Sequence, residues 1–400
     1  MHFEDSAEDA AFRAEWRAWL TVNAKPRTPE SGFAALVARG GDSAETVATG
    51  REWQHRLAAE GWGAIAWPRE YGGRAATPTQ TYIFAKELSE FEKPPDLYSI
   101  GLGMIGPTII LWGTDEQKST YLPSMLDGSE IWCQLWSEPG AGSDVASVRT
   151  SARQSADGSW LLNGQKVWTS GAQWARWGLA VVRTDPAAAK HRGLSTLIVD
   201  MTAPGVDVRP LKEMSGGTTF NEVFFTDVVV PASNVVGPVG EGWKVALTTM
   251  AHERLTAGLM GVATLTPDPL LALARRATRN GRPAVEDPVI RQRLIDVLIR
   301  HRVLELTVFR TLTTAARTGV PGPESSTLKL SWSEVASAQA ELALDLLSLG
   351  GTVTGPEAPY AGSIAELYTF APSFHLGGGT DEIQRNVIGE QVLGLPKEPR

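Results

Sequence analysis

Two stretches of sequence, Trp136-Ser-Glu-Pro-Gly-Ala-Gly-Ser-Asp144 and Asn163-Gly-Gln-Lys-Val-Trp-Thr-Ser-Gly171, decide how the whole chain is interpreted. The first sets small residues between two acids, which lets the backbone approach a bulky ligand closely and point amide N–H groups at it. The Pro-Gly and Asn-Gly pairs are also ordinary turn chemistry. A plain glycine-rich hairpin is therefore the alternative to a cofactor-binding loop.

The side chains around these turns favour the cofactor. Serine hydroxyls and the indole of Trp168 stand on strand-like runs, where they can hold one flat molecule with polar edges. Together the two stretches resemble the flavin-binding signature of the acyl-CoA dehydrogenases, whose flavin is FAD. The resemblance implies cofactor contacts at the following residues: Gln134, Trp136, Ser137, Gly142, Ser143, Trp168 and Ser170.

The composition is that of a globular protein with more than one core. The 400 residues are 42% hydrophobic and 20% charged, which is enough apolar material for two or three domains. A formal net charge of -8 argues against a nucleic-acid surface. The single cysteine, Cys133, excludes an intrachain disulfide framework and a cysteine-based zinc site, and it fits a reducing cytosol.

The ends and the apolar runs point to the cytoplasm. The segment Met1-His-Phe-Glu-Asp-Ser-Ala-Glu-Asp9 is acidic and lacks the basic-then-apolar order of an export signal. No apolar run approaches the length that spans a membrane. We expect a cytoplasmic protein without a membrane span.

Hydrophobic periodicity divides the chain into three segments. The period is mainly helical over residues 1–130, switches to two over 131–238, and becomes helical again over 239–400. Short connections between the strands exclude a dinucleotide-type parallel sheet. We expect an α+β fold, mainly α, with an N-terminal helical domain, a central antiparallel β domain that binds the flavin, and a C-terminal four-helix bundle. This is also the acyl-CoA dehydrogenase order, and the resemblance covers nearly the whole chain.

Local signals place individual elements. Asp157-Gly158 and Asn163-Gly164 predict hairpins, and Thr114 predicts a helix N-cap. Long helices are expected at 243–265, 288–318, 325–349 and 380–393, with connecting loops at 319–323 and 350–359. One stripe of the second helix should face the core, which makes its histidine a satisfied core residue: Ile290, Leu294, Val297, His301, Leu304 and Val308.

The chemistry implied by the family needs a base, a hydride acceptor, and donors to an enolate-like oxygen. FAD supplies the acceptor. The segment Gly377-Gly-Gly-Thr-Asp-Glu-Ile-Gln-Arg385 resembles the second family signature, in which many members place the base, a glutamate, directly before Gly-Thr. Gly378 stands at that position here, so the usual acid is missing.

Another branch of the family, which includes isovaleryl-CoA and long-chain dehydrogenases, places its glutamate on the first long helix of the C-terminal domain, directly before an arginine. Glu253-Arg254 matches this placement, which implies Glu253 as the base and Arg254 as an orienting residue. The alternatives are a solvated or paired glutamate and an inter-helix salt bridge. Mostly small residues share the helix face of Glu253: Thr249, Thr256, Ala257 and Met260.

Gly378 keeps a role through its backbone. Its N–H stands just before a helix that Thr380 can cap, where it can polarise the thioester oxygen, as the corresponding amide does in the family. The resemblance also assigns cofactor contacts to Thr380 and Glu382. The three glycines widen the pocket and favour a branched or bulky acyl group.

The residues that the family lends to a neighbouring subunit's flavin are altered here. The corresponding stretches read Arg279-Asn-Gly-Arg282, Glu286-Asp-Pro288 and Leu347-Ser-Leu-Gly-Gly351, so that only the basic character survives. Arg279, or alternatively Arg276, is the expected contact to the pyrophosphate. We expect either a homo-oligomer such as a tetramer or a heterotetramer with a homologous subunit.

The resemblance implies an acyl-CoA dehydrogenase of lipid metabolism and fatty acid β-oxidation that passes electrons to an electron-transfer flavoprotein. Two alternatives stay open. One is a flavin monooxygenase on the same fold, and the other is a non-catalytic or half-site subunit of a heteromeric enzyme. The sequence does not identify the acyl group.

Overall fold

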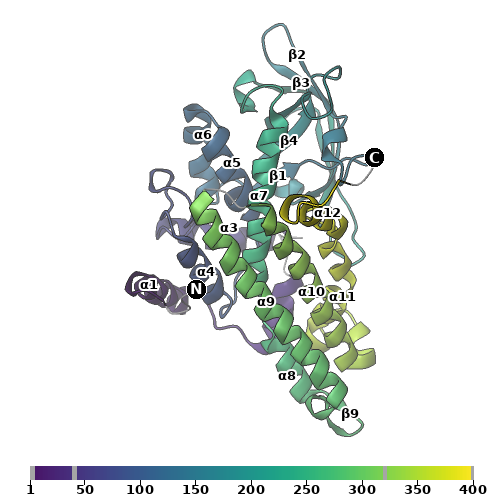
Figure 1. The fold of residues 1–400 in the computed structure, drawn as a ribbon. Coiled ribbons are helices and arrows are strands. Elements are labelled where there is room, and N and C mark those ends of the chain that lie inside the picture. Colours follow the sequence, from purple (N-terminus) through teal and green to yellow (C-terminus); the bar gives the residue numbers. More distant parts are fainter. Residues whose placement is uncertain (1–4, 38–42, 319–321, 398–400) are drawn as a thin grey trace. The chain divides into compact units, whose positions relative to one another are not determined.

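The computed structural model describes residues 5–37, 43–318 and 322–397 (Figure 1). Backbone contacts divide the chain into two compact units. Unit 1 comprises Met1–Ala38, Ala76–Lys93 and Arg254–Arg400, and unit 2 comprises Arg39–Ala75 and Pro94–Glu253. The division of the sequence into segments at residues 130 and 238 stays a prediction.

Unit 2 contains a group of helices beside a sheet. Its helical elements are α3 (Ala44–Ala59), η1 (Arg69–Tyr71), η2 (Gly101–Ile105), α5 (Gly106–Trp112), α6 (Asp115–Leu126), η3 (Val145–Ser147), η4 (Ala172–Trp174) and η5 (Ala232–Asn234). The helix α7 (Gly242–Thr264) belongs to unit 2 up to Glu253 and to unit 1 from Arg254. The predicted cap of α6 is confirmed. The Thr114 hydroxyl accepts the Gln117 N–H, and the Gln117 side chain accepts the Thr114 N–H, which forms a capping box.

The sheet of unit 2 has the strand order β6-β7-β3-β2-β4-β5-β8, and β1 pairs with β4. Its strands are β1 (Trp132–Leu135), β2 (Ser151–Gln154), β3 (Trp160–Ser170), β4 (Trp177–Arg183), β5 (Leu194–Asp200), β6 (Val206–Pro210), β7 (Phe220–Val230) and β8 (Val235–Val236). Most neighbours are antiparallel, as predicted, but β1 and β2 each pair with β4 in parallel. The long connection from β1 to β4 makes a parallel crossover possible.

One of the two predicted hairpins is found. Asp157-Gly158 turns the chain between β2 and β3, with Gly158 at φ +87°. The prediction for Asn163-Gly164 is wrong, because this pair lies inside β3, where the register with β7 shifts. Gly164 has φ +148°, and a Cβ there would lie 2.6 Å from the Thr150 hydroxyl. The glycine therefore serves a β-bulge and a close approach of two strands.

Unit 1 is built from helices, of which α9, α10 and α11 pack side by side (Figure 1). Its helices are α1 (Ala7–Asn23), α2 (Pro29–Val37), α4 (Pro78–Leu88), α8 (Asp268–Arg276), α9 (Pro288–Thr318), α10 (Ser326–Leu347), α11 (Ser363–Phe374), α12 (Asp381–Val387) and the π-helix η10 (Ile388–Val392). Its shorter elements are β9 (Thr278–Arg279), β10 (Arg282–Pro283), η6 (Ala284–Glu286), η7 (Pro323–Ser325), η8 (Ser348–Thr352) and η9 (Pro359–Gly362).

The predicted bounds of α9 are confirmed, whereas α8 and α11 were not predicted. The predicted loop 319–323 lies largely outside the described residues. All six predicted core positions of α9 are buried. His301 is buried but not satisfied, because its Nε2 has no hydrogen-bond partner among the described residues. Burial lowers the pKa of this imidazole.

One apolar segment is longer than predicted. Within the described residues, Gly242–Arg276 is long and apolar enough to cross a membrane by length and composition. The prediction that no apolar run approaches this length is therefore wrong. Half of its apolar window is buried inside the protein, and core helices of globular proteins pass the same test, so the segment is weak evidence for a span.

Candidate functional site

The residues predicted to form the site fall into two sets, one in each unit. Unit 2 holds Gln134, Trp136, Ser137, Gly142, Ser143, Trp168, Ser170 and Glu253. Unit 1 holds Arg254, Arg279, Gly378, Thr380 and Glu382.

The two stretches that open the sequence analysis lie against each other in unit 2. The Val167 N–H donates to the Ser137 carbonyl over 2.9 Å. The Lys166 ammonium, on β3, donates to the Trp136 and Val181 carbonyls and to the Glu138 carboxylate, at 2.9, 2.8 and 2.9 Å. The two stretches, far apart in the sequence, are thus hydrogen-bonded to each other.

A buried ion pair between Glu138 and Lys166 joins the two stretches, and it was not predicted from the sequence. Their side chains are 8% and 0% exposed. Burial would raise the pKa of Glu138, but the Lys166 charge and the Arg149 N–H lower it below its ordinary value. Burial lowers the pKa of Lys166 to about 8, against the opposing pull of Glu138, so the ammonium form still prevails at neutral pH. The sequence signal that could have predicted this ion pair was an acid, Glu138, in one stretch and a lysine, Lys166, in the other.

Trp168 presents a flat aromatic surface. It lies where the register of β3 with β7 shifts between Lys166 and Thr169, and its backbone has φ +58°. Its side chain is 62% exposed and packs edge-on against Phe220, with 6.0 Å between ring centroids. A bulky residue with positive φ and an exposed indole is strained and poorly shielded, which is typical of a ligand-binding position.

The hydroxyls predicted to contact the cofactor are available to a ligand. Ser137 and Ser170 are half-buried and Ser143 is exposed, and within the described residues none of these hydroxyls makes a hydrogen bond. A Cβ added at Gly142 would meet nothing within 4 Å, so the loop is open there. An exposed indole, hydroxyls on two stretches that are hydrogen-bonded to each other, and an open loop fit FAD.

The remaining two predicted contacts of this set are less accessible. Gln134 is half-buried in β1. Trp136 is buried, its carbonyl is bound by Lys166, and its indole N–H has no partner among the described residues.

Glu253 and Arg254 occupy successive half-buried positions of α7. On the predicted face of Glu253, Thr256 and Ala257 are half-buried as well. Thr249 is different, because it is fully buried and its hydroxyl lies 2.9 Å from that of Thr108 on α5. Thr249 therefore packs within unit 2 and leaves no space for a ligand on its side of Glu253.

The glycine-rich segment of unit 1 exposes a backbone donor. Gly378 and Gly379 have φ +70° and +86°. The Gln384 amide donates to their carbonyls at 2.8 and 3.3 Å. The Gly378 N–H, by contrast, has no acceptor within the described residues.

Thr380 and Glu382 are engaged within unit 1. The Thr380 hydroxyl accepts the Ile383 N–H and caps α12, as predicted. The Glu382 side chain is 76% exposed and lies 3.6 Å from the Arg385 guanidinium.

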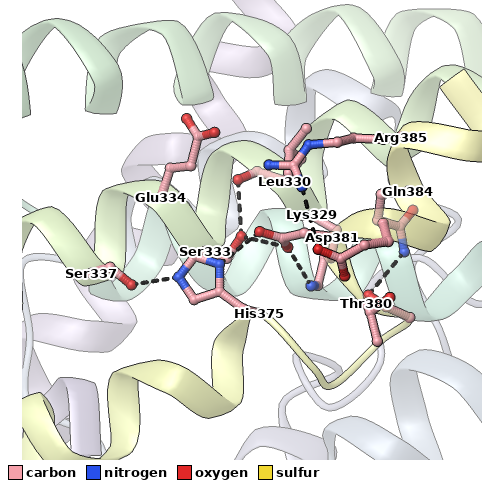
Figure 2. A network of polar contacts seen from close by, with 12 residues as sticks. Lys329, Leu330, Ser333, Glu334, Ser337, His375, Thr380, Asp381, Gln384 and Arg385 are labelled. Carbon is pink, nitrogen blue, oxygen red and sulfur yellow. Dashed lines mark hydrogen bonds and ion pairs between the residues drawn. The ribbon is translucent and has the colours of Figure 1, made fainter. Parts of the chain in front are cut away.

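A polar network connects the start of α12 to α10 (Figure 2). The Asp381 carboxylate accepts from Lys329 at 2.9 Å and from Ser333 at 3.1 Å, and it lies 2.6 Å from His375 Nδ1. Burial would raise the pKa of Asp381, but the hydrogen bonds from His375 and Lys329 lower it. These contacts were not predictable from the sequence, because they join residues of separate elements that share no local pattern.

The two arginines predicted to reach a pyrophosphate contact acids of their own unit. Arg276 pairs with Glu30, and Arg279 lies 3.6 Å from Asp287. Both guanidinium side chains are more than half exposed. The structure gives no reason to prefer either.

Three family models match successive parts of the chain. They describe the acyl-CoA dehydrogenase N-terminal domain over residues 6–129, the middle domain over 133–228 and the C-terminal domain over 240–393.

Relatives and solved structures agree with these matches. The acyl-CoA dehydrogenase IpdE1 of Mycobacterium tuberculosis is 39% identical over 393 residues, which cover 97% of this chain and 98% of the relative. The Tcur3481-Tcur3483 steroid ACAD has a TM-score of 0.85 at 28% identity and covers 100% of both chains. The ChsE4-ChsE5 complex of Mycobacterium tuberculosis has a TM-score of 0.79 at 30% identity, over 99% of this chain and 100% of that one.

Proposed function

Because this chain belongs to the acyl-CoA dehydrogenase family, we propose that it oxidises an acyl-CoA thioester to the 2-enoyl-CoA with FAD as cofactor. FAD, when bound, accepts the hydride from the β carbon. The observation that carries the proposal is that the stretch with exposed Trp168 is hydrogen-bonded, from the Val167 N–H to the Ser137 carbonyl, to the stretch with Ser137 and Ser143. Within the described residues the hydroxyls of Ser137, Ser143 and Ser170 make no hydrogen bond. Ser137, Ser143, Trp168 and Ser170 would hold the flavin.

Glu253 is the proposed base for the α-proton. Gly378 stands where many family members have their glutamate, and it has no side chain that could take a proton. Glu253 is half-buried on α7, directly before Arg254, as in the branch of the family with a relocated base. A carboxylate held next to a thioester can take the α-proton as a general base. Arg254 would orient the site.

Gly378 is the proposed donor to the thioester oxygen. Its N–H has no acceptor within the described part of the chain, whereas the neighbouring carbonyls are bound by Gln384. A preorganised donor of this kind stabilises the negative charge that develops on the oxygen as the α-proton leaves.

A bulky, steroid-derived acyl group is the proposed substrate class. Two observations support it. Gly377, Gly378 and Gly379 place no side chains beside the proposed donor. A solved structure that is similar over the whole chain is a steroid ACAD. A thin straight-chain acyl group would leave such a pocket partly empty.

We further propose that the chain works in the cytoplasm with a homologous subunit and passes its electrons to an electron-transfer flavoprotein. The heteromeric partner is supported by the altered stretches around Arg279, Glu286 and Leu347. It is also supported by the ChsE4-ChsE5 complex, which is similar over almost the whole chain.

Product analysis tests the function. Purified yellow protein would be incubated with a panel of acyl-CoA thioesters, steroid-derived and straight-chain, and an artificial electron acceptor. Mass spectrometry should show a product lighter by two hydrogens. A product heavier by one oxygen would instead identify a monooxygenase. Colourless protein that stays inactive both alone and with a homologous subunit would identify a non-catalytic chain.

A further inference from the structure

The loop between α11 and α12 needs help to hold one shape. It reads Leu376-Gly-Gly-Gly-Thr380, and Gly378 and Gly379 both have positive φ. Glycine has the largest backbone freedom to lose on folding, so three in a row resist fixation. The loop carries the proposed thioester donor, whose position must therefore be set by contacts at its ends.

His375 and Asp381 join the two ends of this loop. The Asp381 N–H donates to the His375 carbonyl over 3.1 Å. The side chains meet as well, with His375 Nδ1 2.6 Å from the Asp381 carboxylate (Figure 2). A main-chain and a side-chain hydrogen bond thus close the loop at the same two residues.

Helix α10 anchors both of them. Lys329 and Ser333 donate to the Asp381 carboxylate at 2.9 and 3.1 Å. Ser337 Oγ lies 2.7 Å from His375 Nε2. Asp381 and Lys329 are 5% and 1% exposed, so their pair is shielded from water. Since an ionised carboxylate only accepts, His375 Nδ1 carries the hydrogen of the bond to Asp381.

Hydrogen bonds from Gln384 to the loop carbonyls fix the middle of the loop. Gln384 is fully buried and donates to the Gly378 and Gly379 carbonyls. With the ends closed and the carbonyls bound, the N–H groups of Gly378, Gly379 and Thr380 are left without an acceptor within the described residues. Gly378 is the one of the three at the position where the family resemblance places the thioester donor. The direction of its N–H then depends on whether the closure holds.

We propose that His375, acting with Asp381, is a positioning residue that keeps the Gly378 N–H aimed at the thioester oxygen. The inference rests on the proposed dehydrogenation. His375 touches neither substrate nor cofactor in this account and acts through Asp381. A donor displaced by about 1 Å can lose about 100-fold in rate, so a closure of two hydrogen bonds is large enough to matter.

Hydrogen exchange tests the closure in the protein as purified, independently of activity. His375→Ala removes both side-chain contacts. His375→Asn keeps a donor near the place of Nδ1, and His375→Gln keeps one near Nε2. We expect amide exchange of residues 376–384, which include the Asp381 N–H, to rise about tenfold in His375→Ala and His375→Gln. It should stay near wild type in His375→Asn and in the exposed control His55→Ala.

Steady-state kinetics test the positioning role. His375→Ala should lower kcat about 10- to 100-fold with little change in KM or FAD content, and His375→Asn should restore most of it. Unchanged exchange in His375→Ala, or a loosened loop with full kcat, would overturn the proposal. If the wild-type protein dehydrogenates no acyl-CoA, the proposed function fails, and the exchange result still decides whether His375 closes the loop.

Discussion

Glu138 and Lys166 form the buried ion pair that joins the two stretches proposed to bind the flavin. Glu138→Gln would leave the fully buried Lys166 ammonium without its counter-charge, so we expect the free energy of unfolding to fall by about 3–5 kcal/mol at pH 7. Glu241→Gln is the matched control, because Glu241 and Lys244 are 41% and 61% exposed. It should cost less than about 1 kcal/mol. Urea titrations of both variants measure the difference, and equal losses would contradict a structural role for the buried pair.

The same ion pair makes the free energy of unfolding depend on pH in the acid range. The Lys166 charge and backbone amides overcome the effect of burial and hold the pKa of Glu138 below its ordinary 4.5 in the folded protein. The stabilisation by Glu138 is therefore fully present above about pH 4.5 and is lost as the pH falls through the folded pKa. The stability gap between wild type and Glu138→Gln should narrow as the pH falls below about 4.5. A gap that widens below this pH would show that the pKa of Glu138 is raised instead.

At the scale of elements, the start of α5 packs so closely against the Trp67 ring that its first residue, Gly106, has no room for a side chain. A Cβ at Gly106 would lie 2.1 Å from the Trp67 ring, which is held by its N–H bond to the Leu102 carbonyl. The overlap should outweigh the gain of about 1 kcal/mol from replacing glycine in a helix. We expect Gly106→Ala to lose about 2 kcal/mol in urea titrations. Gly140→Ala, whose Cβ meets nothing within 4 Å, should change stability by less than about 0.5 kcal/mol.

Elements were predictable where their signals are local. The stripe from Ile290 to Val308 and the proline at 288 define α9, since helical spacing and a starting proline are read from the chain itself. The prediction of a hairpin at Asn163-Gly164 was wrong, because its conformation depends on tertiary contacts: the pairing of β3 with β7 and the close approach of Thr150, just before β2. The contacts of His375 depend in the same way on α10 and α12, which only tertiary packing brings together.

At the scale of the whole molecule, the flavin content of the isolated chain is informative. The arginines that could serve a partner's pyrophosphate, Arg276 and Arg279, are paired with Glu30 and Asp287 of their own unit. We therefore expect native mass spectrometry of the chain expressed alone to find fewer than one FAD per chain. Co-expression with a homologous subunit should raise the ratio for the complex. A stable homotetramer with one FAD per chain would remove the reason for a partner.

The most direct measurement of the central claim is the rate of flavin reduction when FAD-loaded protein is mixed with an acyl-CoA without oxygen. The base acts in this half-reaction, so Glu253→Gln should slow bleaching of the flavin about 10²- to 10⁴-fold while FAD content stays unchanged. Glu241→Gln, which changes a partly exposed acid just before α7, should bleach at the wild-type rate. Bleaching of Glu253→Gln at the wild-type rate would contradict the account.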